Sequence, residues 1–163
     1  MAGCRIIIMV LCLTQVAGAA VTAPAALTVQ IAADTKTFTL PALRRALPVA
    51  TVRVYNPAYE REMTYRGFWF DDVLRVARFP MSSEHIAISV ACKDGYIAVM
   101  APVDVGKHRW LLAFEEAGGG WTRLHHGREN VSPAPWYLVG IDKKSFETTP
   151  WPYQVTTIST LDH

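Results

Sequence analysis

The sequence predicts an α+β domain, dominated by mixed or antiparallel β-sheet, with two or three short helices. Three observations support this fold class. Several short runs are apolar throughout or alternate between apolar and polar residues, as β-strands do. Two stretches, near 41–47 and 71–78, place their apolar residues on one helical face. The chain shows neither a β-α-β rhythm nor an internal repeat, so a single domain is expected.

Residues 1–19 have the composition of a secretory signal peptide. Arg5 precedes an apolar run at 6–13, and small residues at 17–20 fit a processing site. The apolar run is much shorter than the roughly 20 residues of a spanning helix, so no membrane span is expected. We therefore expect export to the periplasm or beyond, a flexible arm at 20–26 and a single domain at 27–163.

Cysteine usage and charge restrict the possible partners. Removal of the leader takes Cys4 and Cys12 away and leaves Cys92 without an internal disulfide partner, so the core must supply the stability. The formal net charge of +2 becomes +1 when Arg5 is lost. Such a balance does not indicate nucleic-acid binding, and it favours small molecules or another protein as partners.

The first half of the domain alternates strands with two short helices. We expect an edge strand at 27–31, extended chain at 38–40, a helix at 41–47, a strand at 51–55 and a polar surface crossing at 56–63. An aromatic, turn-bearing stretch at 65–70 then leads into the second helix. Asp71 and Asp72 begin that helix, where carboxylates suit the helix dipole, and this role is favoured over an acid/base pair.

A strand pair at 86–100 is the centre of the domain. Large residues and Cys92 alternate on one face of the first strand, and only alanine and serine occupy the other face. Lys93-Asp94-Gly95 forms a turn, and a second apolar run follows from Tyr96. The turn presents Asp94 and Tyr96 beside a buried strand, which makes it a candidate site, although most such turns are only turns.

The remaining segments complete the sheet. Strands are expected at 110–114 and 153–161, a stiff and then apolar segment at 133–139 is expected to re-enter the sheet, and a loop is expected at 140–152. Gly118-Gly119-Gly120 makes a flexible return and lacks the lysine and spacing of a phosphate-binding loop.

A metal site can be imagined from Cys92, His125 and His126. Adjacent histidines point apart in a strand, and no pair has the i, i+4 or C-x-x-C spacing of convincing sites. These three residues are therefore weak metal candidates, and we expect no metal site.

Several short motifs, in their order along the chain, resemble the molybdopterin-binding domain of sulfite-oxidase-type oxidoreductases. The resemblance covers roughly 64–158 and rests on segments 65–74, 94–96, 111–120, 135–139 and 151–155. It implies that Tyr96 lies near substrate and metal, which makes Tyr96 the catalytic candidate. It also implies that Asp94, Gly95, Tyr96 and Trp136 contact a bound cofactor, with molybdopterin as the possible cofactor.

The sequence departs from that family at the groups that hold the metal centre. The segment that matches the family's metal-binding cysteine, 52–63, contains no cysteine. Trp136 stands in place of one family arginine, and Pro152 or Tyr153 in place of a lysine. The loss of a thiolate and two cations removes the groups that would hold molybdenum and an anionic pterin phosphate.

Two functional hypotheses follow from this reading. The first is an exported, oxidoreductase-like domain that lacks the metal-ligating cysteine and acts as a ligand-binding or redox-partner module. The alternative is an active periplasmic molybdopterin oxidoreductase subunit that passes electrons to a redox protein such as a c-type cytochrome.

Overall fold

A computed structural model describes residues 25–83, 85–127, 129–142 and 151–162. The described residues form strands β1 (Ala26–Ile31), β2 (Asp34–Thr39), β3 (Ala50–Asn56), β4 (Arg61–Trp69), β5 (Ile86–Cys92), β6 (Ile97–Met100), β7 (Trp110–Glu116), β8 (Leu124–His126), β9 (Glu129–Val131), β10 (Tyr137–Gly140) and β11 (Val155–Asp162), with helices α1 (Leu40–Ala46), α2 (Phe70–Ala77) and α3 (Pro102–Lys107). This composition confirms the expected mainly-β, α+β class. The expected leader lies outside the described residues, as do most of the arm and of the 140–152 loop.

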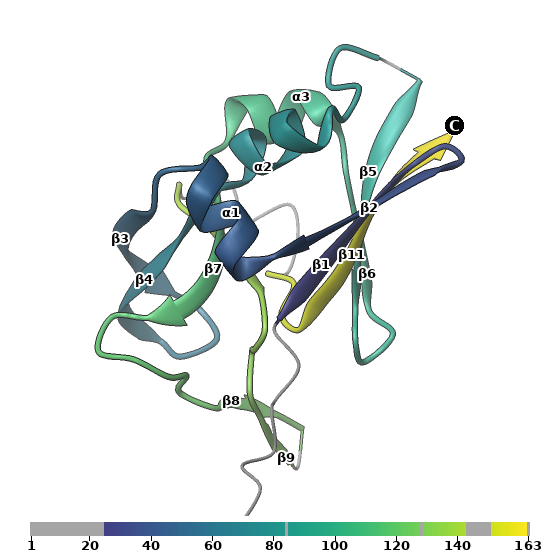
Figure 1. The fold of residues 1–163 in the computed structure, drawn as a ribbon. Coiled ribbons are helices and arrows are strands. Elements are labelled where there is room, and N and C mark those ends of the chain that lie inside the picture. The colour runs from purple at the N-terminus through teal and green to yellow at the C-terminus, as the bar shows by residue number, and fades with distance from the viewer. Residues whose placement is uncertain (1–24, 84, 128, 143–150, 163) are drawn as a thin grey trace, which may run out of the picture.

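Five strands form the first sheet, in the order β2-β1-β11-β5-β6. β1 pairs parallel to β11, with Thr28 opposite Thr157, and the other neighbouring strands are antiparallel. The first and last described strands therefore lie side by side, as Figure 1 shows. The prediction that 27–31 is an edge strand was wrong, because β2 and β11 flank it.

Four antiparallel strands form the second sheet, in the order β10-β7-β4-β3, and β8 and β9 make a small separate ribbon. β4 corrects the predictions for 61–63 and 65–70, whereas 57–60 forms the turn that joins β3 to β4. β4 is a continuous strand from Arg61 to Trp69, paired with β3 on one side and β7 on the other. Gly67 makes no turn. A Cβ there would lie 2.5 Å from the Leu112 carbonyl oxygen, so its glycine permits close strand packing.

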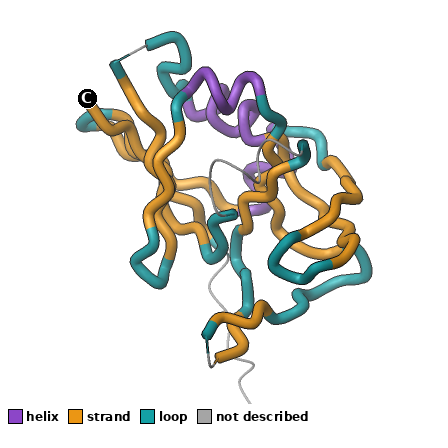
Figure 2. The backbone as a smooth tube through the Cα atoms, turned by 180° about the vertical axis from the view of Figure 1, so that it is seen from behind, coloured by secondary structure: helices purple, strands orange, loops and turns teal. Residues whose placement is uncertain are grey.

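The three helices gather in one group where the two sheets approach each other (Figures 1 and 2). α2 buries Phe70, Val73, Leu74 and Ala77 completely, which confirms the predicted helical face. In α1, the Thr39 side chain accepts a hydrogen bond from the Ala42 amide nitrogen and caps the helix.

The core and the helices have two further features. One cluster of buried residues includes side chains from both sheets and from all three helices.

None of the described helices is long and apolar enough to cross a membrane.

Candidate functional site

The predicted turn residues Asp94 and Tyr96 line a pocket of about 490 Å³, which we call the Tyr96 pocket. Its other described walls come from the β3–β4 turn, from β8, from the start of β10 and from the segment before β11. They are Pro57, Ala58, Leu124, His125, Tyr137, Trp151 and Tyr153. The pocket thus joins five segments that lie far apart in the sequence.

Asp94 is held in place by two hydrogen bonds. Its Oδ1 atom accepts from the Tyr96 amide nitrogen at 3.0 Å, which fixes the turn. Its carboxylate also forms a side-chain hydrogen bond with Tyr153. Burial, and then this bond to Asp94, raise the pKa of Tyr153 to about 12, so its phenol remains a donor at neutral pH. Gly95 lies at the crest of the turn, with a left-handed φ of 89°, and does not line the pocket.

Tyr96 is partly exposed, at 36% of its surface. Burial raises its pKa, and the neighbouring Cys92 and Asp94 raise it further. The phenol is therefore protonated at neutral pH. In this state Tyr96 can donate a hydrogen bond and offer its ring, but it cannot act as a base.

Two aromatic side chains form the inner wall. The rings of Tyr137 and Trp151 meet edge to face with centroids 6.1 Å apart. Beneath them, the fully buried Asn56 donates from Nδ2 to the Tyr137 hydroxyl at 3.1 Å and to the Tyr65 hydroxyl at 2.7 Å. This network holds Tyr137 rigidly at the base of the pocket.

Trp136, predicted as a cofactor contact, lies elsewhere. It is fully buried in the core and does not line the Tyr96 pocket. Its neighbour Tyr137 takes the place in the wall that was expected for Trp136. Without rearrangement, a ligand in the pocket would not touch the indole of Trp136.

The three weak metal candidates are not brought together as a ligand set. Cys92 is 7% exposed in the core, and burial, followed by the charge of Asp94, raises its pKa to about 12. His125 is exposed, and its Nδ1 lies 3.2 Å from Asn130 Oδ1. His126 belongs to β8, and only its backbone is described. No group of three or more potential ligands is found among the described residues.

The described residues do not fit a molybdopterin centre. A protonated, buried thiol is a poor metal ligand, because the thiolate is the binding form. No lysine or arginine is among the described residues that line the Tyr96 pocket, and Asp94 would repel an anionic pterin phosphate. The chemistry of the donor set thus agrees with the departures noted in the sequence.

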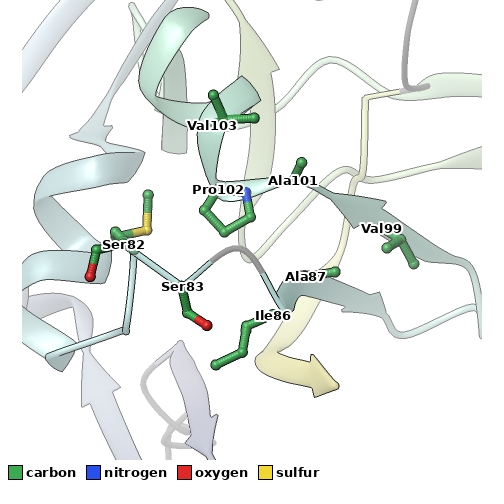
Figure 3. Close-up of a pocket in the computed structure, with 9 residues that line it drawn as sticks. Ser82, Ser83, Ile86, Ala87, Val99, Ala101, Pro102 and Val103 are labelled. Carbon is green, nitrogen blue, oxygen red and sulfur yellow. The ribbon is translucent and has the colours of Figure 1, made fainter. Parts of the chain in front are cut away.

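A second cavity, of about 540 Å³, lies where β5, β6 and the start of α3 meet (Figure 3). Its described walls include Ser82, Ser83, Ile86 and Val99, with no ionisable group. The Tyr96 pocket is therefore the better candidate for specific recognition, since it combines aromatic walls with fixed polar groups.

Several pocket residues were missed by sequence reasoning. Tyr153 and Trp151 were assigned to a strand and a loop, and Pro57 and Ala58 to a surface crossing. No local pattern could have identified them, because the contacts that bring them to Asp94 span 36 or more residues of sequence.

Comparison of the chain with known protein families and with curated proteins finds no match. The resemblance to the sulfite-oxidase-type domain therefore stays a prediction.

Proposed function

We propose that this protein is an exported, non-catalytic module that binds a small organic ligand in the Tyr96 pocket. In this proposal it has the general architecture of a molybdopterin-binding domain without that domain's metal centre. The observation that carries the proposal is the convergence of five separate segments on one cavity with both aromatic and polar walls.

The size and rigidity of the cavity support ligand binding. A volume of about 490 Å³ lies in the range of ordinary small-molecule sites. The Asp94 carboxylate and the Tyr137 ring are both held by hydrogen bonds before any ligand arrives. Such preorganisation lowers the entropy lost on binding.

The protonation states argue against Tyr96, Tyr153 and Cys92 as general bases or ionised nucleophiles. The raised pKa values of Tyr96, Tyr153 and Cys92 keep all three groups neutral at physiological pH. A general base, or a nucleophile that attacks in an already ionised form, needs a pKa near or below the working pH. The pocket is thus equipped to recognise a molecule through hydrogen bonds and ring contacts.

A ligand screen by thermal shift tests the proposal, with protein purified from the periplasm of an exporting host. We expect some aromatic or heterocyclic compounds to raise the melting temperature of the wild type. Tyr96→Ala should abolish these shifts. Tyr55→Ala is the matched control, because Tyr55 is 48% exposed on β3 and does not line the pocket.

Metal analysis of the same preparation separates this proposal from its alternative. We expect substoichiometric molybdenum. Stoichiometric molybdenum, together with reduction of a c-type cytochrome, would establish the oxidoreductase alternative. Ligand shifts that are equal in Tyr96→Ala and wild type would place the binding site elsewhere.

A further inference from the structure

The described wall of the Tyr96 pocket contains a carboxylate and lacks a lysine or arginine. Asp94 is the only carboxylate among the described lining residues, and His125 is the only other residue there with an acidic or basic side chain apart from the tyrosines. A second carboxylate, Glu116, lies behind the wall, close enough to Tyr137 and Tyr59 to raise their pKa values. The interior side of the pocket is therefore negative.

A lysine and an arginine adjoin lining residues in the described chain, and neither of them lines the pocket. Lys93 precedes Asp94 in the turn, but it is exposed and does not line the pocket. Arg123 directs its Nη1 to the Asn130 carbonyl oxygen at 3.2 Å. An anionic ligand would thus meet carboxylates without a compensating cation in the described wall.

Aromatic rings make up a large part of the remaining pocket wall. Tyr96, Tyr137, Trp151 and Tyr153 all line the cavity. The faces of such rings carry partial negative charge and attract cations, and tryptophan and tyrosine do so most strongly. Several rings beside one carboxylate form the usual composition of sites for quaternary or methylated ammonium groups.

We infer that the Tyr96 pocket binds an organic cation, an ammonium group that carries methyl or other apolar substituents. The cation lies near Asp94 and the tyrosine rings, and its apolar substituents pack against Leu124, Pro57 and Ala58. This inference rests on the proposed ligand-binding function and specifies the class of ligand.

Three probes of similar shape and different charge test it by isothermal titration calorimetry. They are choline, its uncharged isostere 3,3-dimethylbutan-1-ol and the anion 3,3-dimethylbutanoate. We expect choline to bind at least about ten-fold more tightly than the alcohol, and the anion to bind most weakly. Tyr96→Ala should weaken choline binding, and Tyr96→Phe should retain it, because phenylalanine keeps the ring.

A charge-removing substitution of Asp94 tests whether this residue causes the preference for choline over the uncharged alcohol. Asp94→Asn should lower choline affinity by about ten-fold and leave the affinity for the alcohol nearly unchanged. The matched control is Asp34→Asn, an exposed carboxylate in the hairpin of β1 and β2. It should change neither affinity.

The outcomes separate the two proposals. If the alcohol or the anion binds as tightly as choline, and Tyr96→Ala weakens that binding, the charge preference is wrong and the ligand-binding function stands. The same conclusion follows if none of the probes binds while the thermal-shift screen finds pocket ligands. If both the probes and the screen find nothing at this site, both proposals fall.

Discussion

The side-chain amide of Asn56 joins the two edges of the four-stranded sheet by donating a hydrogen bond to the Tyr137 hydroxyl, 3.1 Å away. Asn56 ends β3 at one edge, and Tyr137 begins β10 at the other. Between them, Tyr65 of β4 accepts a second bond from the same nitrogen at 2.7 Å. The side-chain Oδ1 atom of Asn56 accepts from the Ala58 amide nitrogen, so one side chain organises both the sheet and the pocket wall.

Replacement of Asn56 by alanine should destabilise the protein by about 3 kcal/mol, because it leaves buried tyrosine hydroxyls and a backbone amide without their partner. Urea denaturation, monitored by tryptophan fluorescence, measures the change in the free energy of unfolding. Asn130→Ala, on an exposed strand, should change it by less than about 0.5 kcal/mol. A loss below about 1 kcal/mol for Asn56→Ala would show that water replaces the network.

Gly67→Ala should destabilise the protein by about 3 kcal/mol or more. The added Cβ would lie 2.5 Å from the Leu112 carbonyl oxygen and 2.8 Å from the Ala113 Cα, and both are backbone atoms of a buried strand. Gly106→Ala is the matched control, because Gly106 is helical and nothing lies within 4 Å of its added Cβ. That substitution should stabilise by about 0.5 kcal/mol. Equal effects of the two substitutions on thermal unfolding would contradict the close packing of β4 on β7.

Tyr153→Phe should loosen the Asp94 turn while leaving global stability within about 1 kcal/mol. The substitution removes the hydrogen bond to the Asp94 carboxylate, which in turn accepts from the Tyr96 amide. We expect the Tyr96 amide to exchange its hydrogen several-fold faster, as measured by NMR. Exchange at the Leu112 amide, in the sheet core, serves as the internal control. An unchanged rate at Tyr96 would mean that the turn does not depend on Tyr153.

Stability should fall as the pH rises above about 9. Burial raises the pKa of Cys92 from 9.0 to about 12, so the native state keeps a proton that the unfolded state releases. The unfolded state then binds fewer protons, and the free energy of unfolding decreases by about 1.4 kcal/mol per pH unit for this group. Buried Tyr65 and Tyr137, whose pKa values are also raised, should steepen the decline above pH 10.

Urea midpoints between pH 8 and pH 10.5 measure this dependence. Cys92→Ala removes one titrating group and should flatten the slope between pH 9 and 10. At pH 8, iodoacetamide should label Cys92 only after denaturation, as read by peptide mapping. Rapid labelling of the native protein at Cys92 would contradict the protonated, buried thiol.

Local patterns predicted those elements whose residues determine their own conformation. The alternation before Cys92, the Asp94-Gly95 turn and the apolar face of α2 all appear in the structure where they were expected. β4 was missed because its first half is polar and because glycine, as at Gly67, is common in turns. Its extended conformation depends on pairing with β3 and β7. α3 was missed because six residues with a glycine carry too little periodicity.

Only the part of the candidate site that lies within one short segment of sequence could be predicted. Asp94 and Tyr96 share a turn, and their positions followed from the sequence. Trp136 was predicted from the family resemblance. Neighbouring residues of extended chain face opposite ways, and in the structure Trp136 faces the core while Tyr137 lines the pocket. Tyr153 reaches Asp94 through tertiary packing, to which no short window of sequence is sensitive.

The parallel pairing of β1 with β11 determines when the molecule can fold. Thr28 lies opposite Thr157 within the five-stranded sheet. β1 therefore has only β2 as a pairing partner until β11 has been synthesised. During synthesis, β11 is the last of the described strands to leave the ribosome. The five-stranded sheet cannot close before then, so its assembly depends on a contact between strands about 130 residues apart in sequence.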